Sequence, residues 1–136
     1  MIAEIVPARK GVQSGERIEG TVTWVAEKPP RKAELRLFWH TRGKGDRDSE
    51  LVETVTFELP QPSDTRPFSF RAPAYPPSFS GRLISLVWGL ELVLEPGESS
   101  AIELTIGPGG KELSIDRTDW LQISELPKYG HFRVGQ

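Results

Sequence analysis

The stretch "PPSFSGRLISLVWGLELVLEP", residues 76 to 96, follows a proline-rich turn with a long apolar run. Apolar residues occupy every second position of this run, and the positions between them hold a mixture of serine, valine, glycine and glutamate. Alternation at period two is typical of a β-strand with one face buried in a core. The apolar set expected to face that core comprises Ile84, Leu86, Trp88, Leu90, Leu92 and Leu94.

A helix or a membrane span over the same residues is disfavoured. A helix would carry leucines on all sides without a polar stripe, and Gly89 in its interior would cost about 1 kcal/mol relative to alanine. A membrane-spanning helix needs roughly 20 apolar residues, whereas this run is shorter and is interrupted by Glu91. We therefore predict a buried strand and no membrane span.

Length and composition indicate one globular domain that lacks cysteine chemistry. The chain has 136 residues, no cysteine, a net charge of −2 and a pI of about 5.7. This length can bury a real core without disulfides, and the charge balance lacks the basic field expected of a protein that binds nucleic acid. Glu4 and Pro7 interrupt the N-terminal stretch where a signal peptide would be uninterruptedly apolar. We expect a cytoplasmic protein that binds no nucleic acid.

Alternation recurs along the chain and predicts an all-β fold. Apolar runs are separated by turns rich in proline, glycine and aspartate, as in an immunoglobulin-like β-sandwich. We predict two mainly antiparallel sheets of about seven to nine strands over residues 1–108. A tail over residues 109–136 would form a short strand or helical turn, beginning near Thr118, and then a mobile end. Large rings expected to fill the core are Trp24, Trp39, Phe68, Phe70 and Trp88. Leu51, Val55, Phe57 and Leu59 are expected to share one strand face, with only Glu53 among them.

Motifs for catalysis are absent from the sequence. There is no G-x-S-x-G elbow, and the two histidines are His40, expected on an exposed strand face, and His131. The acidic run "GDRDSE" lacks the glycine and the distant glutamate of a calcium loop. We therefore expect no catalytic residue, no metal site, no cofactor and no enzymatic activity.

The four tryptophans leave a second function open, a carbohydrate- or small-ligand-binding β-sandwich module. Sugars stack on exposed indole rings, so this function would need a row of them at the surface. Three of the tryptophans fall on the apolar sets of their strands, and Trp120, in the tail, does not.

Three short motifs, taken together, resemble the amino-terminal domain of the arrestin clan, here in a single-domain bacterial form. That domain has an early G-E-x-V-x-G-x-V strand, then an F-x-F strand, a proline-proline-serine turn and a long strand with an aromatic followed by aliphatics. The matching residues are Gly15, Glu16, Ile18, Gly20, Val22, Phe68, Phe70, Pro76, Pro77, Ser78 and Trp88.

The resemblance covers about residues 10 to 95 and departs from the family at two positions. Val12 stands where an aromatic usually precedes the G-E pair, and Trp88 stands where the long strand commonly has tyrosine. The chain ends where a second arrestin domain would begin, so the interdomain polar core and the phosphate-triggered release of a tail are not implied. The resemblance implies an arrestin-like β-sandwich that acts as a scaffold or adaptor and binds a protein or peptide partner through its loops or a sheet edge.

The candidate binding segment is the glycine-rich stretch "HTRGKGDRD", residues 40 to 48, which we expect to form a loop. Arg42, Lys44 and Arg47 would contact an acidic partner, with Trp120 and Tyr129 of the tail as apolar anchors. The alternative is an ordinary solvated loop, since exposed charges are usual on soluble surfaces. Open strand edges would also allow a homo-oligomer through edge-strand pairing.

Overall fold

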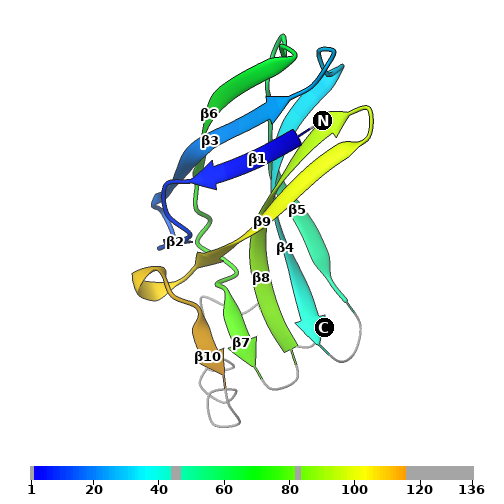
Figure 1. Ribbon diagram of the computed structural model, residues 1–136. Coiled ribbons are helices and arrows are strands. Elements are labelled where there is room, and N and C mark those ends of the chain that lie inside the picture. Colours follow the sequence, from blue (N-terminus) through cyan, green and yellow to red (C-terminus); the bar gives the residue numbers. More distant parts are fainter. Residues whose placement is uncertain (1, 44–46, 82–83, 116–136) are drawn as a thin grey trace.

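The computed structural model describes residues 2–43, 47–81 and 84–115, and these residues form two β-sheets (Figure 1). Ten strands are present in the described part, above the predicted seven to nine because several are only two or three residues long. None of its helices is long and apolar enough to span a membrane. The strands are β1 (Ile2–Pro7), β2 (Gly11–Val12), β3 (Arg17–Val25), β4 (Lys32–Gly43), β5 (Ser49–Thr56), β6 (Ser63–Arg71), β7 (Phe79–Gly81), β8 (Ile84–Glu95), β9 (Glu98–Ile106) and β10 (Leu113–Ile115).

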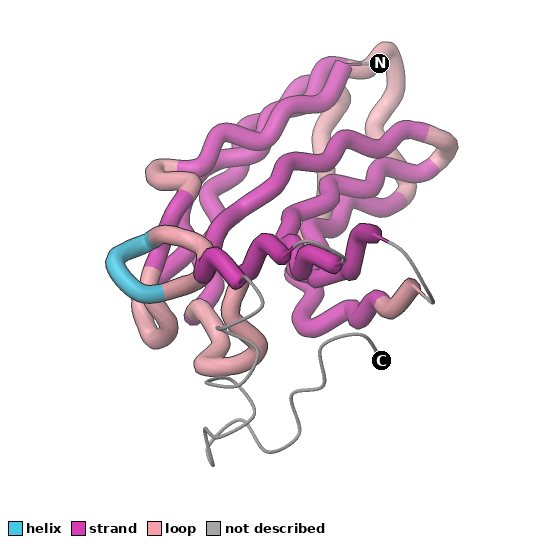
Figure 2. The backbone as a smooth tube through the Cα atoms, turned by 90° about the horizontal axis from the view of Figure 1, so that it is seen from below, coloured by secondary structure: helices cyan, strands magenta, loops and turns pink. Residues whose placement is uncertain are grey.

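The predicted all-β sandwich is confirmed. The smaller sheet has the order β1-β3-β6 and is antiparallel throughout. The larger sheet has the order β10-β7-β8-β4-β5, with β9 also paired to β8 and β2 paired to β9. Parallel pairing occurs between β2 and β9 and between β10 and β7, so the fold is mainly antiparallel, as predicted. Figure 2, seen from below, shows that strands make up most of the described chain, with one short helical turn.

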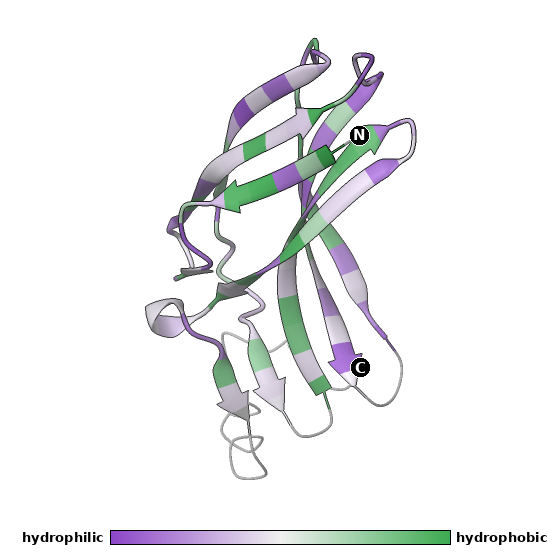
Figure 3. Ribbon diagram, viewed as in Figure 1, coloured by the Kyte–Doolittle hydropathy of each residue, from purple (hydrophilic) through white to green (hydrophobic). Residues whose placement is uncertain are grey.

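Strands β4 and β8 form the long central pair of the larger sheet. Each has 12 residues, and their antiparallel register runs from Lys32 opposite Glu95 to Gly43 opposite Ile84. The apolar set predicted for residues 84 to 94 is buried, with exposed fractions between 0% and 4%. Figure 3 shows the same alternation as bands of high and low hydropathy along the strands. Burial of one face therefore fixes the register of this pair, because a slip by one residue would turn the apolar set to solvent.

The core contains four of the five large rings named from the sequence. Trp24 and Trp88 have no exposed surface, and Phe68 and Phe70 are buried beside them. Trp39 departs from the expectation, because it is only partly buried and packs against the margin of the core.

A β-bulge overturns the predicted face of Leu51. The β4–β5 register shifts between Leu37 and Phe38, where Val52 is the extra residue on β5. A bulge reverses the alternation beyond it. Val55 therefore faces the core while Leu51 lies opposite Phe38 on the outer face, with 54% of its surface exposed. Leu59 also departs from the predicted shared face, because β5 ends at Thr56 and Leu59 lies exposed in the connection that follows.

The segment expected to be a loop over residues 40–48 is partly strand. β4 continues to Gly43 and pairs with β8 to its end, so His40 and Arg42 lie on the sheet. Residues 44–46, including Lys44, lie outside the described residues.

The first residues of the predicted tail form a short turn and a short strand, and the strand adds to the larger sheet. A 3-10 turn spans Pro108–Gly110, and β10 then pairs in parallel with β7. The remaining tail, 116–136, lies outside the described residues, as do the predicted turn at Thr118 and the predicted anchors Trp120 and Tyr129.

Trp88 and Trp39, both predicted to lie in the core, differ in the hydrogen bonding of their indole rings. The indole Nε1 of buried Trp88 donates to the Pro76 carbonyl at 2.8 Å, whereas the buried Nε1 of Trp39 finds no acceptor among the described residues. Trp88→Phe leaves a buried carbonyl without its donor and should cost about 1 to 3 kcal/mol of unfolding free energy. Trp39→Phe removes an unsatisfied donor and should cost less than about 1 kcal/mol.

Urea midpoints of the two variants check this prediction, and Trp88→Ala, at about 3 to 5 kcal/mol, sets the upper end of the scale. A Trp39→Phe variant as destabilised as Trp88→Phe would contradict the assignment.

Candidate partner-binding groove

The edge of β8 is shared by two strands, and this creates a fork in the larger sheet. β7 pairs with the start of β8 up to Phe79 opposite Leu86, and β9 takes over from Trp88 opposite Leu104. β9 then leaves β8 and pairs with β2. We call the space where β7 and β9 part the fork.

Ser78 ties the two arms of the fork together. Its amide donates to the Ile106 carbonyl at 2.7 Å, and the Ile106 amide donates to Ser78 Oγ at 2.9 Å. The Ser78 carbonyl also accepts from the Leu113 amide at 3.0 Å. With 2% of its surface exposed, this serine has a structural role: its hydroxyl is engaged in holding β9 beside β7 and β10.

An exposed ion pair spans β8 at the fork. Arg42 of β4 and Glu103 of β9 lie on the outer face, opposite Ser85 and Gly89 of β8 respectively. Arg42 Nη2 lies 3.1 Å from Glu103 Oε2, and the two side chains are 56% and 62% exposed. Val87, which lies between these positions on the same face and is nearly buried, forms an apolar floor.

Two adjoining hollows of about 580 and 320 Å³ open at this ion pair, and we call them together the fork groove. Both are lined by Arg42, Val87, Glu103 and Glu112, and the smaller one also by Lys10. The fork groove therefore presents charges of both signs around an apolar floor.

A second Arg–Glu pair on the same sheet face is held differently. Glu34 is 5% exposed and accepts hydrogen bonds from Arg36, with Lys32 Nζ 3.5 Å away. Burial acts to raise the pKa of the Glu34 carboxyl, but the hydrogen bond and charge of Arg36, helped by Lys32, offset burial and lower the pKa below its ordinary value. The Glu34 carboxylate is therefore buried within its ion pair, whereas both side chains of the Arg42–Glu103 pair are exposed and can exchange partners with other charged groups.

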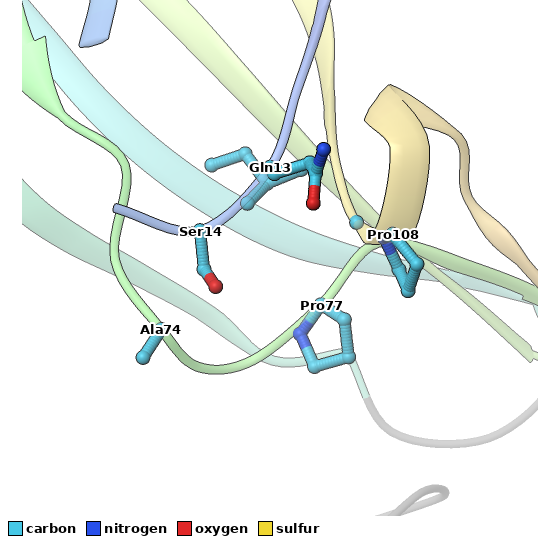
Figure 4. A pocket seen from close by; sticks show the side chains of 7 residues that line it. Gln13, Ser14, Ala74, Pro77 and Pro108 are labelled. Carbon is cyan, nitrogen blue, oxygen red and sulfur yellow. The ribbon is translucent and has the colours of Figure 1, made fainter. Parts of the chain in front are cut away.

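A smaller hollow of about 170 Å³ lies near the start of β3 (Figure 4). Gln13 and Ser14 line it from one loop, Ala74 and Pro77 from a second, and Pro108 from the 3-10 turn. It holds no charged group, so it offers little beyond room for a few atoms.

The residues predicted for partner binding fall into three groups. Arg42 lies in the fork groove, but on a strand and already paired with a carboxylate, so it is not the free cation that was expected. Arg47 is exposed and follows the undescribed segment. Lys44, Trp120 and Tyr129 lie outside the described residues. His40 is partly exposed, and its ring stacks on Phe38 with centroids 6.0 Å apart.

Sequence reasoning missed Lys10, Glu103 and Glu112. These residues come from three separate segments, and the strand register that gathers them carries no local signal in the sequence.

The described residues do not offer the side chains that metal binding or sugar binding would need. Among the described residues, no three His, Asp or Glu side chains are grouped so that they could hold a metal ion. Of the three described tryptophans, Trp24 and Trp88 are buried and Trp39 is partly buried, so these residues do not form the row of exposed rings that sugar binding would need.

Comparison with known proteins identifies the fold alone. No family model and no curated protein matches the sequence. Among solved structures, the chain is similar to Spo0M, a sporulation control protein from Bacillus subtilis, with a TM-score of 0.56 and 17% identity. The match covers 78% of this chain and 49% of that chain, so the protein spans about half the length of the structure it matches. This likeness supports the arrestin-like fold that the motifs predicted.

The contrast between the two Arg–Glu pairs is testable with double-mutant cycles in urea. Exposed pairs contribute about 0.2 to 1 kcal/mol, so alanine substitutions at Arg42 and Glu103 should show coupling in that range. The Arg36–Glu34 coupling should be larger, because one partner is buried.

The Glu34 pair should also depend on pH. Because its folded pKa lies below the unfolded value, its stabilisation is present above the unfolded pKa and is lost as the pH falls through the folded pKa. A stronger coupling at Arg42–Glu103 than at Arg36–Glu34 would show that the fork pair is structural.

Proposed function

We propose that this chain is a non-catalytic protein-interaction domain that binds a short extended segment of a protein partner in the fork groove. The observation that carries the proposal is the exposed Arg42–Glu103 ion pair above the apolar floor of Val87. Loops and sheet margins on a rigid sandwich commonly carry binding of this kind.

The ion pair suits exchange with a partner. Breaking an exposed pair costs about 1 kcal/mol or less, so a partner that offers a carboxylate to Arg42 and a cation to Glu103 replaces one set of contacts with another at little cost. Desolvation of these charges against Val87 on binding strengthens the new contacts.

The charges that line the groove narrow the kind of partner. Lys10 and Arg42 face Glu103 and Glu112, so the groove has no excess of either sign. A purely acidic segment would be attracted by the two cations of the groove and repelled by its two carboxylates. We therefore propose a segment that carries charges of both signs, with an apolar side chain for Val87, in place of the acidic partner expected from residues 42 to 47.

The absence of catalysis is part of the proposal. The described lining of the groove contains no histidine, and the buried Ser78 hydroxyl is already held by the Ile106 amide. We also propose that the protein is cytoplasmic, because Glu4 and Pro7 interrupt the N-terminal stretch where a signal peptide would be apolar.

Selection from a random peptide display library on the immobilised protein tests the function. We expect enrichment of peptides with charges of both signs, and we expect Arg42→Glu or Glu103→Arg to weaken their binding at least tenfold by loss of a charged contact. The double variant R42E/E103R restores the ion pair in the reversed direction and should prefer a different set of peptides.

Arg71→Glu is the matched control, since Arg71 is exposed on the smaller sheet. Peptides whose affinity falls equally for Arg71→Glu, or does not respond to Arg42 and Glu103, would place binding elsewhere and contradict the proposal.

A further inference from the structure

Leu59 is an exposed leucine on a constrained backbone. Its side chain is 83% exposed, and it is the one non-glycine residue in the described chain with a positive φ, at 48°. Leucine rarely adopts this conformation, and strained residues of this kind are concentrated at functional sites. The Leu59 carbonyl accepts from Gln61 Nε2 at 3.0 Å and from Arg66 Nη2 at 3.1 Å, so the conformation is fixed by side chains around it.

The segment that carries Leu59 is attached to the core and to the neighbouring loop. Trp24 Nε1 donates to the Gln61 carbonyl at 2.7 Å, and the Ala26 amide donates to the Pro62 carbonyl at 2.7 Å. At the other end of this segment, the Phe57 amide donates a hydrogen bond to the Ala33 carbonyl at 2.9 Å. The loop between β5 and β6 is therefore held beside the loop between β3 and β4.

A hollow of about 470 Å³ lies at this same end of the sandwich. Its apolar lining comes from Ala26, Pro29, Pro30 and Pro96, and its charged lining comes from Lys28, Arg31 and the single carboxylate of Glu27. The Arg31 amide donates to the Glu95 carbonyl at 2.9 Å, which holds the β3–β4 loop against the β8–β9 turn. In Figure 1 the three connections lie together at the top of the molecule.

We propose that two copies of this chain associate end to end, with Leu59 of each copy inserted into the proline-lined hollow of the other. A twofold interface requires that a surface and its complement lie on the same patch of one molecule. The exposed Leu59 and the apolar hollow satisfy this requirement, because they lie on adjoining loops. At 83% exposure, Leu59 does not fill the hollow of its own chain.

The charges around these two features are also complementary. Glu58 is exposed next to Leu59, and the hollow carries two exposed cations, Lys28 and Arg31, against one exposed carboxylate, Glu27, so positive charge is in excess by one. Insertion of Leu59 into the other copy therefore brings the Glu58 carboxylate to a lining with an excess of one positive charge, twice in a symmetric dimer. Opposite charges at an interface fix its orientation and favour this partner over others.

The interface is small and the fork groove stays free. Because only three short connections would meet, we expect an interface smaller than the roughly 1,200 Å² of a stable complex, and therefore a weak dimer whose population depends on concentration. β4 begins beside the hollow at Lys32 and ends beside the fork groove at Gly43. The dimer therefore holds two fork grooves facing away from each other, and its formation does not depend on the proposed peptide binding.

Sedimentation velocity of the purified chain over a hundredfold range of concentration tests the proposal. We expect the weight-average mass of the wild type to rise toward that of a dimer. Leu59→Asp and Leu59→Gly should both weaken association at least tenfold, and glycine suits the positive φ, so loss of association in that variant is not a loss of folding. Leu51→Asp, on the exposed face of β5, is the control and should leave the mass unchanged.

Charge reversal identifies the contact. Glu58→Arg and Arg31→Glu should each weaken association, and the double variant E58R/R31E should restore it, because the two sites meet across the twofold axis. A wild type that stays monomeric throughout, an association that ignores Leu59, or a double variant weaker than both single variants would overturn the proposal.

Discussion

The backbone pairing of β4 with β8 holds the other strands of the larger sheet in place. It is the longest ladder in the described chain, and it supplies both margins to which the other strands of the larger sheet attach. β5 extends it on one side, while β7 and β9 share the other. Its inner face also packs against the smaller sheet through the leucines of β8 and the rings of Trp24 and Phe70. One buried face and one register therefore position every feature described above.

The length of this pair separates two surfaces of different chemistry. At about 3.3 Å per residue, a strand of 12 residues spans roughly 36 Å from the proline-lined hollow to the fork groove. Charges of both signs surround an apolar floor at one end, and an exposed leucine lies beside an apolar hollow at the other. The strands between them are held by backbone pairs on both sides, so neither end needs to move for the other to bind a partner.

How far the sequence predicts this structure depends on how local each cause is. Alternation predicts the strands and the burial of Trp88, because it reports a face that must avoid water. It fails at Leu51, since a single bulged residue reverses the face, and no residue type marks the bulge in advance. The fork groove was not predictable either: Arg42 and Glu103 meet only because β4 and β9 pair with opposite edges of β8, about 60 residues apart in sequence. Alternation also placed Leu59 on a strand face, and this was wrong because the strand ends at Thr56 and a positive φ in leucine has no sequence signature.

Amide hydrogen exchange measured by NMR tests whether the β4–β8 pair is the rigid frame of the molecule. The amides of Leu90 and Leu92 lie between β4 and β9, so they should exchange only when the whole domain unfolds, with an opening free energy equal to that from urea. The amides of β5, at the edge of the sheet, should open at lower free energy. If the opening free energy of the Leu90 and Leu92 amides lay well below the global unfolding free energy, or if these amides exchanged as fast as those of β5, the β4–β8 pair would not be the rigid frame.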